Sequence, residues 1–249
     1  MQLKELSDYI GSELAISRFR DYCPNGVQVE GRSDVLRIAT GVTASQAVLD
    51  AAAAWGADAI LVHHGYFWRG EDAAITGVKK RRIARLLERD ISLLAYHLPL
   101  DAHPLWGNNA QLASRLGLVE SGRFGEQDIA CYGTLACPMD LAEFSRLVVE
   151  VLDFEPLLVG EGKSGKLSRI AWCSGAAQGY FEQAIALGVD VFLTGEISEN
   201  NVHVARECGV IYAAAGHHAT ERYGVQALGA HLAEKFGLEH RFFDEEVPV

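Results

Sequence analysis

The sequence lacks both a long apolar run and a secretion signal at its start. No apolar segment among its 249 residues approaches the roughly 20 residues needed to span a bilayer. The first six residues, MQLKEL, begin an amphipathic pattern, whereas a signal peptide begins with a basic region followed by an apolar one. These absences predict a soluble, cytoplasmic protein that does not enter a membrane.

Paired cysteines and an excess of positive charge are also missing. The five cysteines are scattered and never form a C-x-x-C arrangement, which argues against a disulfide framework or a zinc ribbon, so we expect reduced thiols. The 33 acidic residues outnumber the 22 basic ones, for a net charge of −11, so broad binding to nucleic acid is not expected. The basic run at residues 79–82 is interpreted as a solvated helix face, with phosphate binding as the alternative.

The sequence contains two copies of one supersecondary unit. The segment beginning at Arg37 aligns without gaps with the segment beginning at Arg169, and each copy reads strand, helix, Gly-x-Asp turn, strand. The helices are expected over residues 45–55 and 178–187, each closed by a glycine. The strands that follow, residues 59–62 and 191–194, are unbroken apolar runs of the kind that parallel sheets bury on both faces.

This repeat predicts an α/β fold with two pseudo-equivalent β-α-β lobes, each with a largely parallel sheet flanked by helices. We expect the first lobe over residues 1–120 and the second over 129–249, with the glycine- and charge-rich residues 119–128 as the linker. A strand, a turn at Pro138 and a helix over residues 141–152 are expected near the start of the second lobe.

Histidines and carboxylates stand where three apolar, strand-like runs end. They are His63 and His64, then Asp101, then His217 and Glu221. Because the carboxyl ends of neighbouring parallel strands converge, we expect these five side chains to form a metal site in the cleft between the lobes. Taken alone, the His63-His64 pair is more typical of a structural or surface pair, and only the combination favours metal.

The residue types indicate a pair of divalent cations. The carboxylate of Glu221, four residues after His217 near a predicted helix start at Ala219, can bridge two ions, as in many hydrolases. Zn, Fe, Mn and Co all suit such ligands. His97 and His218 are candidate catalytic acids or bases, with orienting and core roles as alternatives. We expect the remaining histidines to be surface residues: His103, His203, His231 and His240.

Several short motifs carry a resemblance to a known family. They are PNGVQVEG (24–31), GVTAS (41–45), VHHG (62–65), HLPLD (97–101), GNNA (107–110), TGE (194–196) and GHHATE (216–221). Over nearly its whole length the chain resembles the GTP cyclohydrolase 1 type 2 homologue family, also called the NIF-three-like family, in its short bacterial form.

The resemblance implies a two-lobed α/β protein assembled as a ring-shaped homohexamer with two metal ions in each subunit. On matching positions, His64 and Asp101 would hold one ion, His63 and His217 the other, and Glu221 would bridge both.

Three functions are compatible with such a site. The leading hypothesis is a metal-dependent hydrolase of purine nucleotides that opens the imidazole ring of GTP at C8, with His97 or His218 carrying the proton. The second keeps the site and changes the substrate to damaged or modified nucleotides, phosphoesters or amides. The third is a ring-forming, non-catalytic protein that binds metals or partners.

Overall fold

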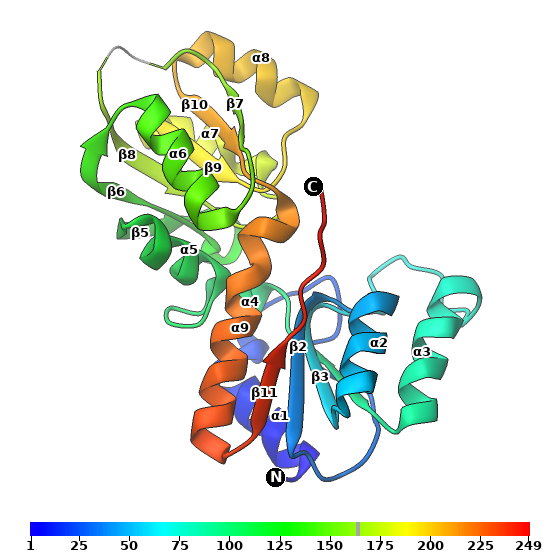
Figure 1. Ribbon diagram of the computed structural model, residues 1–249. Coiled ribbons are helices and arrows are strands. Elements are labelled where there is room, and N and C mark those ends of the chain that lie inside the picture. The colour runs from blue at the N-terminus through cyan, green and yellow to red at the C-terminus, as the bar shows by residue number, and fades with distance from the viewer. Residues whose placement is uncertain (163–164) are drawn as a thin grey trace. The chain divides into compact units, whose positions relative to one another are not determined.

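The computed structural model describes residues 1–162 and 165–249, which divide into two compact units. Unit 1 comprises residues 1–100 and 224–246, and unit 2 comprises residues 101–223 and 247–249. Each unit has one β-sheet with helices packed on it (Figure 1). The predicted α/β class is therefore confirmed, but the units divide at residue 100, whereas the sequence predicts a boundary near residue 120.

Unit 1 has a five-stranded sheet in the order β1-β4-β3-β2-β11. The last four of these strands run parallel, and the edge strand β1 is antiparallel to β4. Helices α2 and α3 lie on one face, and α1 and the second part of α9 lie on the other (Figure 1). The elements are α1 (Leu3–Glu13), η1 (Ile16–Arg18), β1 (Gly26–Val29), β2 (Arg37–Thr43), α2 (Gln46–Trp55), β3 (Ala59–His64), α3 (Gly77–Arg89), β4 (Ser92–Ala95) and β11 (Glu239–Phe242).

Unit 2 has a six-stranded sheet in the order β5-β6-β8-β9-β10-β7, with β8, β9 and β10 parallel at its centre. Two helices cross the division between the units: α4 (Leu98–Ala102) and α9 (His217–Phe236). The elements within unit 2 are α5 (Asn108–Leu116), β5 (Leu118–Phe124), η2 (Glu126–Asp128), β6 (Ala130–Met139), α6 (Leu141–Leu152), β7 (Leu157–Val159), β8 (Leu167–Trp172), η3 (Gln178–Tyr180), α7 (Phe181–Ala186), β9 (Val191–Thr194), α8 (Glu199–Cys208) and β10 (Ile211–Ala214).

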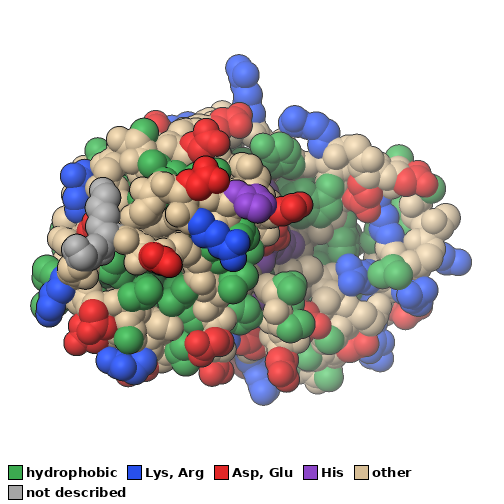
Figure 2. All heavy atoms as spheres, turned by 90° about the horizontal axis from the view of Figure 1, so that it is seen from above, with side chains coloured by type: hydrophobic (Ala, Val, Ile, Leu, Met, Phe, Trp, Pro, Cys, Tyr) green, Lys and Arg blue, Asp and Glu red, His purple; other side chains and the backbone are tan. Residues whose placement is uncertain are grey.

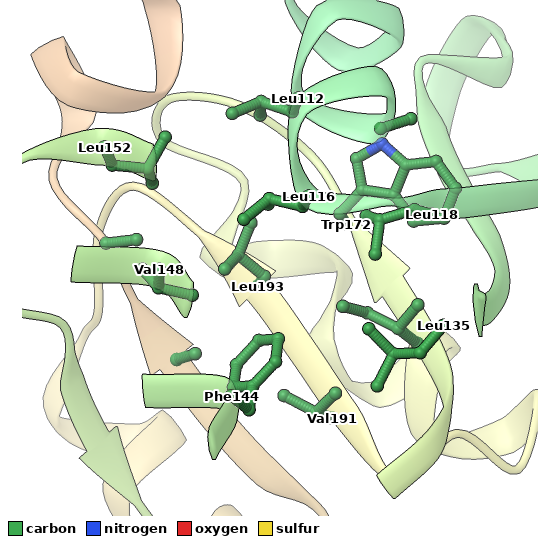
Figure 3. Close-up of a cluster of buried hydrophobic side chains, with 14 of the residues drawn as sticks. Leu112, Leu116, Leu118, Leu135, Phe144, Val148, Leu152, Trp172, Val191 and Leu193 are labelled. Carbon is green, nitrogen blue, oxygen red and sulfur yellow. The ribbon is translucent and has the colours of Figure 1, made fainter. Parts of the chain in front are cut away.

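Apolar side chains fill both faces of the unit 2 sheet. On one face, α5 and α6 pack on the strands, and the side chains labelled in Figure 3, among them Trp172 and Phe144, form one apolar cluster. On the other face, Phe192 and Tyr212 pack against Phe181 of α7. Burial on both faces explains why these parallel strands read as unbroken apolar runs.

The internal repeat is confirmed in the strand registers. Ile38 of β2 pairs with Ala59 of β3, and the aligned residues Ile170 and Val191 pair in the same way. The next strand pairs parallel in each unit, and an antiparallel edge strand follows it, β1 in unit 1 and β7 in unit 2. The two sheets are thus pseudo-equivalent over four strands.

The same carboxylate anchor occurs in both copies of the repeat. Asp58 Oδ2 accepts hydrogen bonds from the backbone N–H groups of Leu36 and Arg37, at 2.9 and 2.8 Å. Asp190 Oδ2 accepts from those of the aligned Ser168 and Arg169, at 2.9 and 2.8 Å. The Gly-x-Asp turn therefore ties the start of one central strand to the start of its neighbour.

The segment predicted as a linker is instead ordered structure of unit 2, because residues 118–124 form β5, the edge strand paired antiparallel with β6. Gly122 in this strand makes room for a neighbouring side chain and is not a sign of a flexible linker. A Cβ at Gly122 would lie 2.6 Å from Tyr132 Oη, so only glycine lets this side chain approach. The register shift between Glu120 and Gly122 interrupts the alternating polar pattern that would have indicated a strand.

Two predicted elements differ in detail. The turn expected at Pro138 is absent from the described chain, because β6 continues to Met139 through an irregular stretch after Thr134 in which proline costs no ladder hydrogen bond. The helix expected over residues 178–187 is the short η3 followed by α7. The predicted helix over residues 141–152 is confirmed as α6, with Asp140 as its capping residue.

The cysteines, the lengths of the helices and the distribution of surface charge can be examined in the structure. All five cysteines lie in the described part of the chain and are free thiols. Within residues 1–162 and 165–249, every helix is too short or too polar to cross a membrane. Acidic and basic side chains are interspersed over the face shown in Figure 2, so the net negative charge is not gathered there.

The anchor at Asp58 can be tested through stability. Asp58→Ala leaves two backbone donors without their carboxylate, so we expect the free energy of unfolding to fall by about 2–4 kcal/mol, measured by urea denaturation. The control is Asp8→Ala, because Asp8 is 65% exposed and makes a surface ion pair with Lys4, for which a loss below about 1 kcal/mol is expected. Equal losses in the two variants would contradict the anchoring role.

Candidate functional site

Three histidines of unit 1 come together at the ends of β3 and β4. The ring centroids of His63 and His64 are 4.6 Å apart, and that of His97 lies 5.1 and 5.8 Å from them. One ring nitrogen of each lies within 4.8 Å of the others, so the group could hold a metal ion. Adjacent residues inside a strand point to opposite faces, but His64 is the last residue of β3, which lets both rings gather.

Each of these rings is held at Nδ1 by a second group. His63 Nδ1 bonds to the carbonyl oxygen of Tyr96 at 3.0 Å, and His64 Nδ1 to Thr43 Oγ1 at 3.1 Å. His97 Nδ1 lies 2.7 Å from Asp21 Oδ1. Metal-binding histidines are generally held in this way, with the other nitrogen directed at the ion.

Asp21 is the main partner of His97 and was not predicted from the sequence. Its side chain is only 4% exposed and also accepts hydrogen bonds from the backbone N–H of Leu98 and from Asn25 Nδ2, at 3.0 and 2.8 Å. Burial disfavours the carboxylate, but the hydrogen bond and charge of His97 outweigh burial and hold the pKa of Asp21 below its ordinary value. The available signal was Asn25 in the PNGVQVEG motif, which also accepts from the backbone N–H of His97 at 2.8 Å.

Cys23 lies beside this pair in a second group that could hold a metal, with Asp21 and His97. Burial, reinforced by the charge of Asp21, raises the pKa of Cys23 to about 12. The thiol is therefore protonated at neutral pH, as expected for a cysteine without a catalytic role.

Asp101 of unit 2 is 5% exposed and has its carboxylate fixed by neighbouring side chains. Its Oδ1 accepts hydrogen bonds from Asn108 Nδ2 at 2.8 Å and from Ser174 Oγ at 2.9 Å. The adjacent Asn109 in turn fixes the loop after β8, because its Oδ1 accepts from the backbone N–H of Ser174 at 2.9 Å. Both donors to Asp101 converge on a single oxygen, which sets the plane of the carboxyl group.

The first turn of α9 brings His217 beside two carboxylates. The helix begins at His217, two residues before the predicted start, so His217 and Glu221 lie on one face. His217 Nδ1 lies 2.7 Å from Glu196 Oε1, and its Nε2 lies 3.1 Å from Glu221 Oε2. A carboxylate oxygen of Glu221 is also within 4.8 Å of one of Asp101.

The two carboxylates beside His217 change the pKa of its imidazole. Burial disfavours the imidazolium, but Glu221 first and then Glu196 outweigh burial and raise the pKa of His217 to about 9. Glu196 was not predicted as a site residue, although it aligns with His64 in the repeat, and that position was the available signal. Gly175, at a φ of 64°, provides necessary space, because a Cβ there would overlap Glu221 Oε1.

Of the predicted ligands, His63 and His64 belong to unit 1, and Asp101, His217 and Glu221 belong to unit 2. The predicted proton carrier His97 lies with the first pair. His218 is half-buried, and its backbone N–H donates to the carbonyl oxygen of Val249 at 3.2 Å. Imidazoles with carboxylates are a donor set suited to divalent transition metals.

The remaining histidines differ in their contacts. His231 and His240 are bonded through Nε2, to Tyr9 Oη at 2.6 Å and Thr40 Oγ1 at 2.9 Å. His103 stacks on Trp106 with a ring separation of 4.5 Å. These three are half-buried, so the prediction of a surface position is wrong for them and confirmed for the exposed His203.

Comparison with known proteins gives full-length matches. The sequence model of the Duf34/NIF3 (NGG1p interacting factor 3) family matches residues 1–248. A protein of Pseudomonas aeruginosa named GTP cyclohydrolase 1 type 2 homolog is 58% identical over 234 residues, which cover 93% of this chain and 92% of that protein. One of the same name from Allochromatium vinosum is 51% identical over 99% of this chain and 97% of its own length.

Solved structures agree with these matches. The structure of protein ybgI, of unknown function, has a TM-score of 0.97 at 46% identity and covers all of both chains. A structure from Thermus thermophilus has a TM-score of 0.91 at 34% identity, again over all of both chains.

The two carboxylates at His217 can be tested in metal-free protein by NMR titration. We expect His217 to titrate near pH 9, and Glu196→Gln to move its pKa toward 6.5. Since the folded-state pKa is raised, its contribution to stability is complete below about pH 6.5 and is lost as pH rises toward 9. The control is Glu182→Gln, an exposed glutamate of α7. An unchanged His217 pKa in Glu196→Gln would rule out this coupling.

Proposed function

Because the chain belongs to the Duf34/NIF3 family, we propose that it is a metal-dependent hydrolase of purine nucleotides. The carrying observation is that His63, His64, His97 and His217 are each held at Nδ1 by a carbonyl, a hydroxyl or a carboxylate. Among the histidines outside the group, His231 and His240 are bonded through Nε2, and His103 Nδ1 accepts the backbone N–H groups of Leu105 and Trp106. Fixing Nδ1 is what a metal-binding imidazole requires.

In this proposal the five residues would divide between two cations. His64 and Asp101 would hold one, His63 and His217 would hold the other, and Glu221 would contribute to both. Asn108 and Ser174 orient Asp101 for this role, since both donate to its Oδ1. When bound, two such cations lower the pKa of a water molecule toward neutrality and stabilise negative charge at the attacked atom.

Proton transfer belongs to the histidines next to the ligands. His97 is the better placed, because Asp21 fixes its Nδ1 and its ring lies 5.1 and 5.8 Å from those of His63 and His64. In the reaction we propose, one water adds at C8 of GTP and one C8–N bond breaks, with His97 or His218 delivering a proton to the nitrogen that departs. A second water then hydrolyses the resulting formamide, which breaks the other C8–N bond and releases formate. The curated relatives' name, GTP cyclohydrolase 1 type 2 homolog, supports this substrate.

Damaged or modified nucleotides, phosphoesters and amides are alternative substrates of the same residues, since the proposed metal chemistry does not depend on a purine ring. A ring-shaped homohexamer is proposed as the assembly, and light scattering of the purified protein measures it.

Formate release tests the substrate. Metal-loaded protein should release formate from GTP, and Glu221→Ala should reduce the rate by at least about 100-fold, because it removes the ligand shared by both cations. A known cyclohydrolase serves as the positive control for the assay. No formate from GTP in the presence of an active control would refute the cyclohydrolase assignment.

Metal content tests the ligands separately. We expect Glu221→Ala to lose most of both cations and Asp101→Ala chiefly one, because Glu221 contributes to both. Elemental analysis of each variant measures this, with His203→Ala, an exposed histidine of α8, as the control. Full occupancy in both site variants would contradict the assignment.

A further inference from the structure

Aromatic side chains border the histidine group of unit 1. The ring of Trp68 lies 5.0 Å from that of His97, at an interplanar angle of 87°, and 6.0 Å from that of His64. Tyr22 lies 6.4 Å from His97 and is 50% exposed, although a tyrosine of a folded domain is usually more buried. Two large rings therefore stand next to the residues proposed for catalysis, and one of them is open to solvent.

Arg69 ties together the two loops that carry these rings. Its backbone N–H donates to the carbonyl oxygen of Tyr22 at 2.7 Å, and its Nη2 donates to that of Asp21 at 2.7 Å. The guanidinium also lies 5.7 Å from the centre of the Tyr22 ring. Tyr22 and Trp68 are thus parts of one connected surface, joined to the Asp21–His97 pair through the backbone.

Trp68 is fixed in place by its own loop. Its Nε1 donates to the carbonyl oxygen of Gly65 at 3.2 Å, and its backbone N–H donates to Glu71 Oε2 at 3.0 Å. Glu71 is held by Lys79 at 3.0 Å, and this lysine is only 12% exposed, so the predicted solvated face does not include it.

The preceding residue, Phe67, has a φ of 64°, a conformation that aromatic residues seldom adopt. Such strain persists only where the surroundings enforce it and is concentrated at functional sites.

We propose that Tyr22 and Trp68 form a stacking site for the base of a purine nucleotide. Every nucleobase has a π-face, and stacking on aromatic side chains is the usual way of binding one without reading its edges. Because Tyr22 and Trp68 neighbour His64 and His97, a base stacked on them would lie beside the residues proposed to act on it. The choice of a purine rests on the proposed function, whereas the stacking of a base rests on the rings of Tyr22 and Trp68.

Comparing two ligands isolates the contribution of the base. GMP and ribose 5-phosphate carry the same phosphate, so any attraction between phosphate and metal cancels in the ratio of their dissociation constants. Calorimetry on the purified, metal-containing protein should show tighter binding of GMP. Tyr22→Ala should reduce this preference by about 5- to 150-fold, the range expected from the loss of one stacking contact. Tyr22→Phe should retain it.

Trp55 provides the matched control, since it is a half-buried tryptophan of unit 1 that packs on Phe243 at the end of α2. Trp55→Phe should keep both the GMP preference and the quenching of tryptophan emission by GMP, whereas Trp68→Phe should lose most of the quenching. Equal binding of the two ligands to the wild type, or an undiminished GMP preference in Tyr22→Ala, would overturn the stacking site.

The stacking site and the proposed reaction can be refuted independently of each other. Loss of GMP preference in Tyr22→Ala, together with no formate from GTP in the wild type, would leave the stacking site standing and remove the cyclohydrolase reaction. Formate release by Tyr22→Ala with an unchanged KM would remove the stacking site alone.

Discussion

Holding each imidazole at Nδ1 is the constraint on which the candidate site depends. A free histidine side chain rotates and exchanges tautomers, so fixing it costs rotamer entropy, up to about 2 kcal/mol for a side chain. A neutral hydrogen bond returns about 1 kcal/mol, and one to a charged group about 1.5–3 kcal/mol. Asp21 and Glu196 offer the stronger kind to His97 and His217, which is why these two distances, 2.7 Å each, are the shortest of the four.

The acids of unit 2 impose an electrostatic cost on the candidate site. Asp101 and Glu221 are both buried and lie within 4.8 Å of one another, so their charges repel strongly in a medium of low dielectric constant. Protonation of His217 offsets part of this repulsion, since its pKa is about 9. A cation must displace that proton, so metal affinity should rise with pH as the proton becomes easier to remove.

Much of the fold was predictable, because the information lies in short segments. Continuous apolar runs identified β3 and β9, capping residues and glycines bounded α2, and the gap-free repeat indicated two equivalent sheets. The ligand candidates were found for the same reason: each follows a strand in a βαβ unit, and that topology sends the ends of parallel strands to one edge.

The groups that hold those ligands were mostly beyond sequence reasoning. Asp21 meets His97 across 76 positions, and Asn109 meets Ser174 across 65, between segments with no shared pattern. The glycines of residues 119–128 led to the wrong prediction of a linker. Gly122 allows the close approach of Tyr132, but a flexible hinge would have the same glycine-rich composition. Local patterns record how a segment is buried, whereas its long-range partners depend on the completed chain.

The two units contribute different chemistry to the proposed function. Unit 1 supplies three imidazoles with the acid Asp21 held against one of them. Unit 2 supplies two acids at His217 and a third, Asp101, near Glu221. Neutral imidazoles gather at little electrostatic cost, whereas clustered carboxylates need compensating charge. In the proposed function, a divalent cation would relieve the repulsion in unit 2 more than it would change the energy of unit 1. The acidic group would therefore depend more on metal for its order, because there the cation would compensate clustered negative charge that protonated His217 offsets only in part.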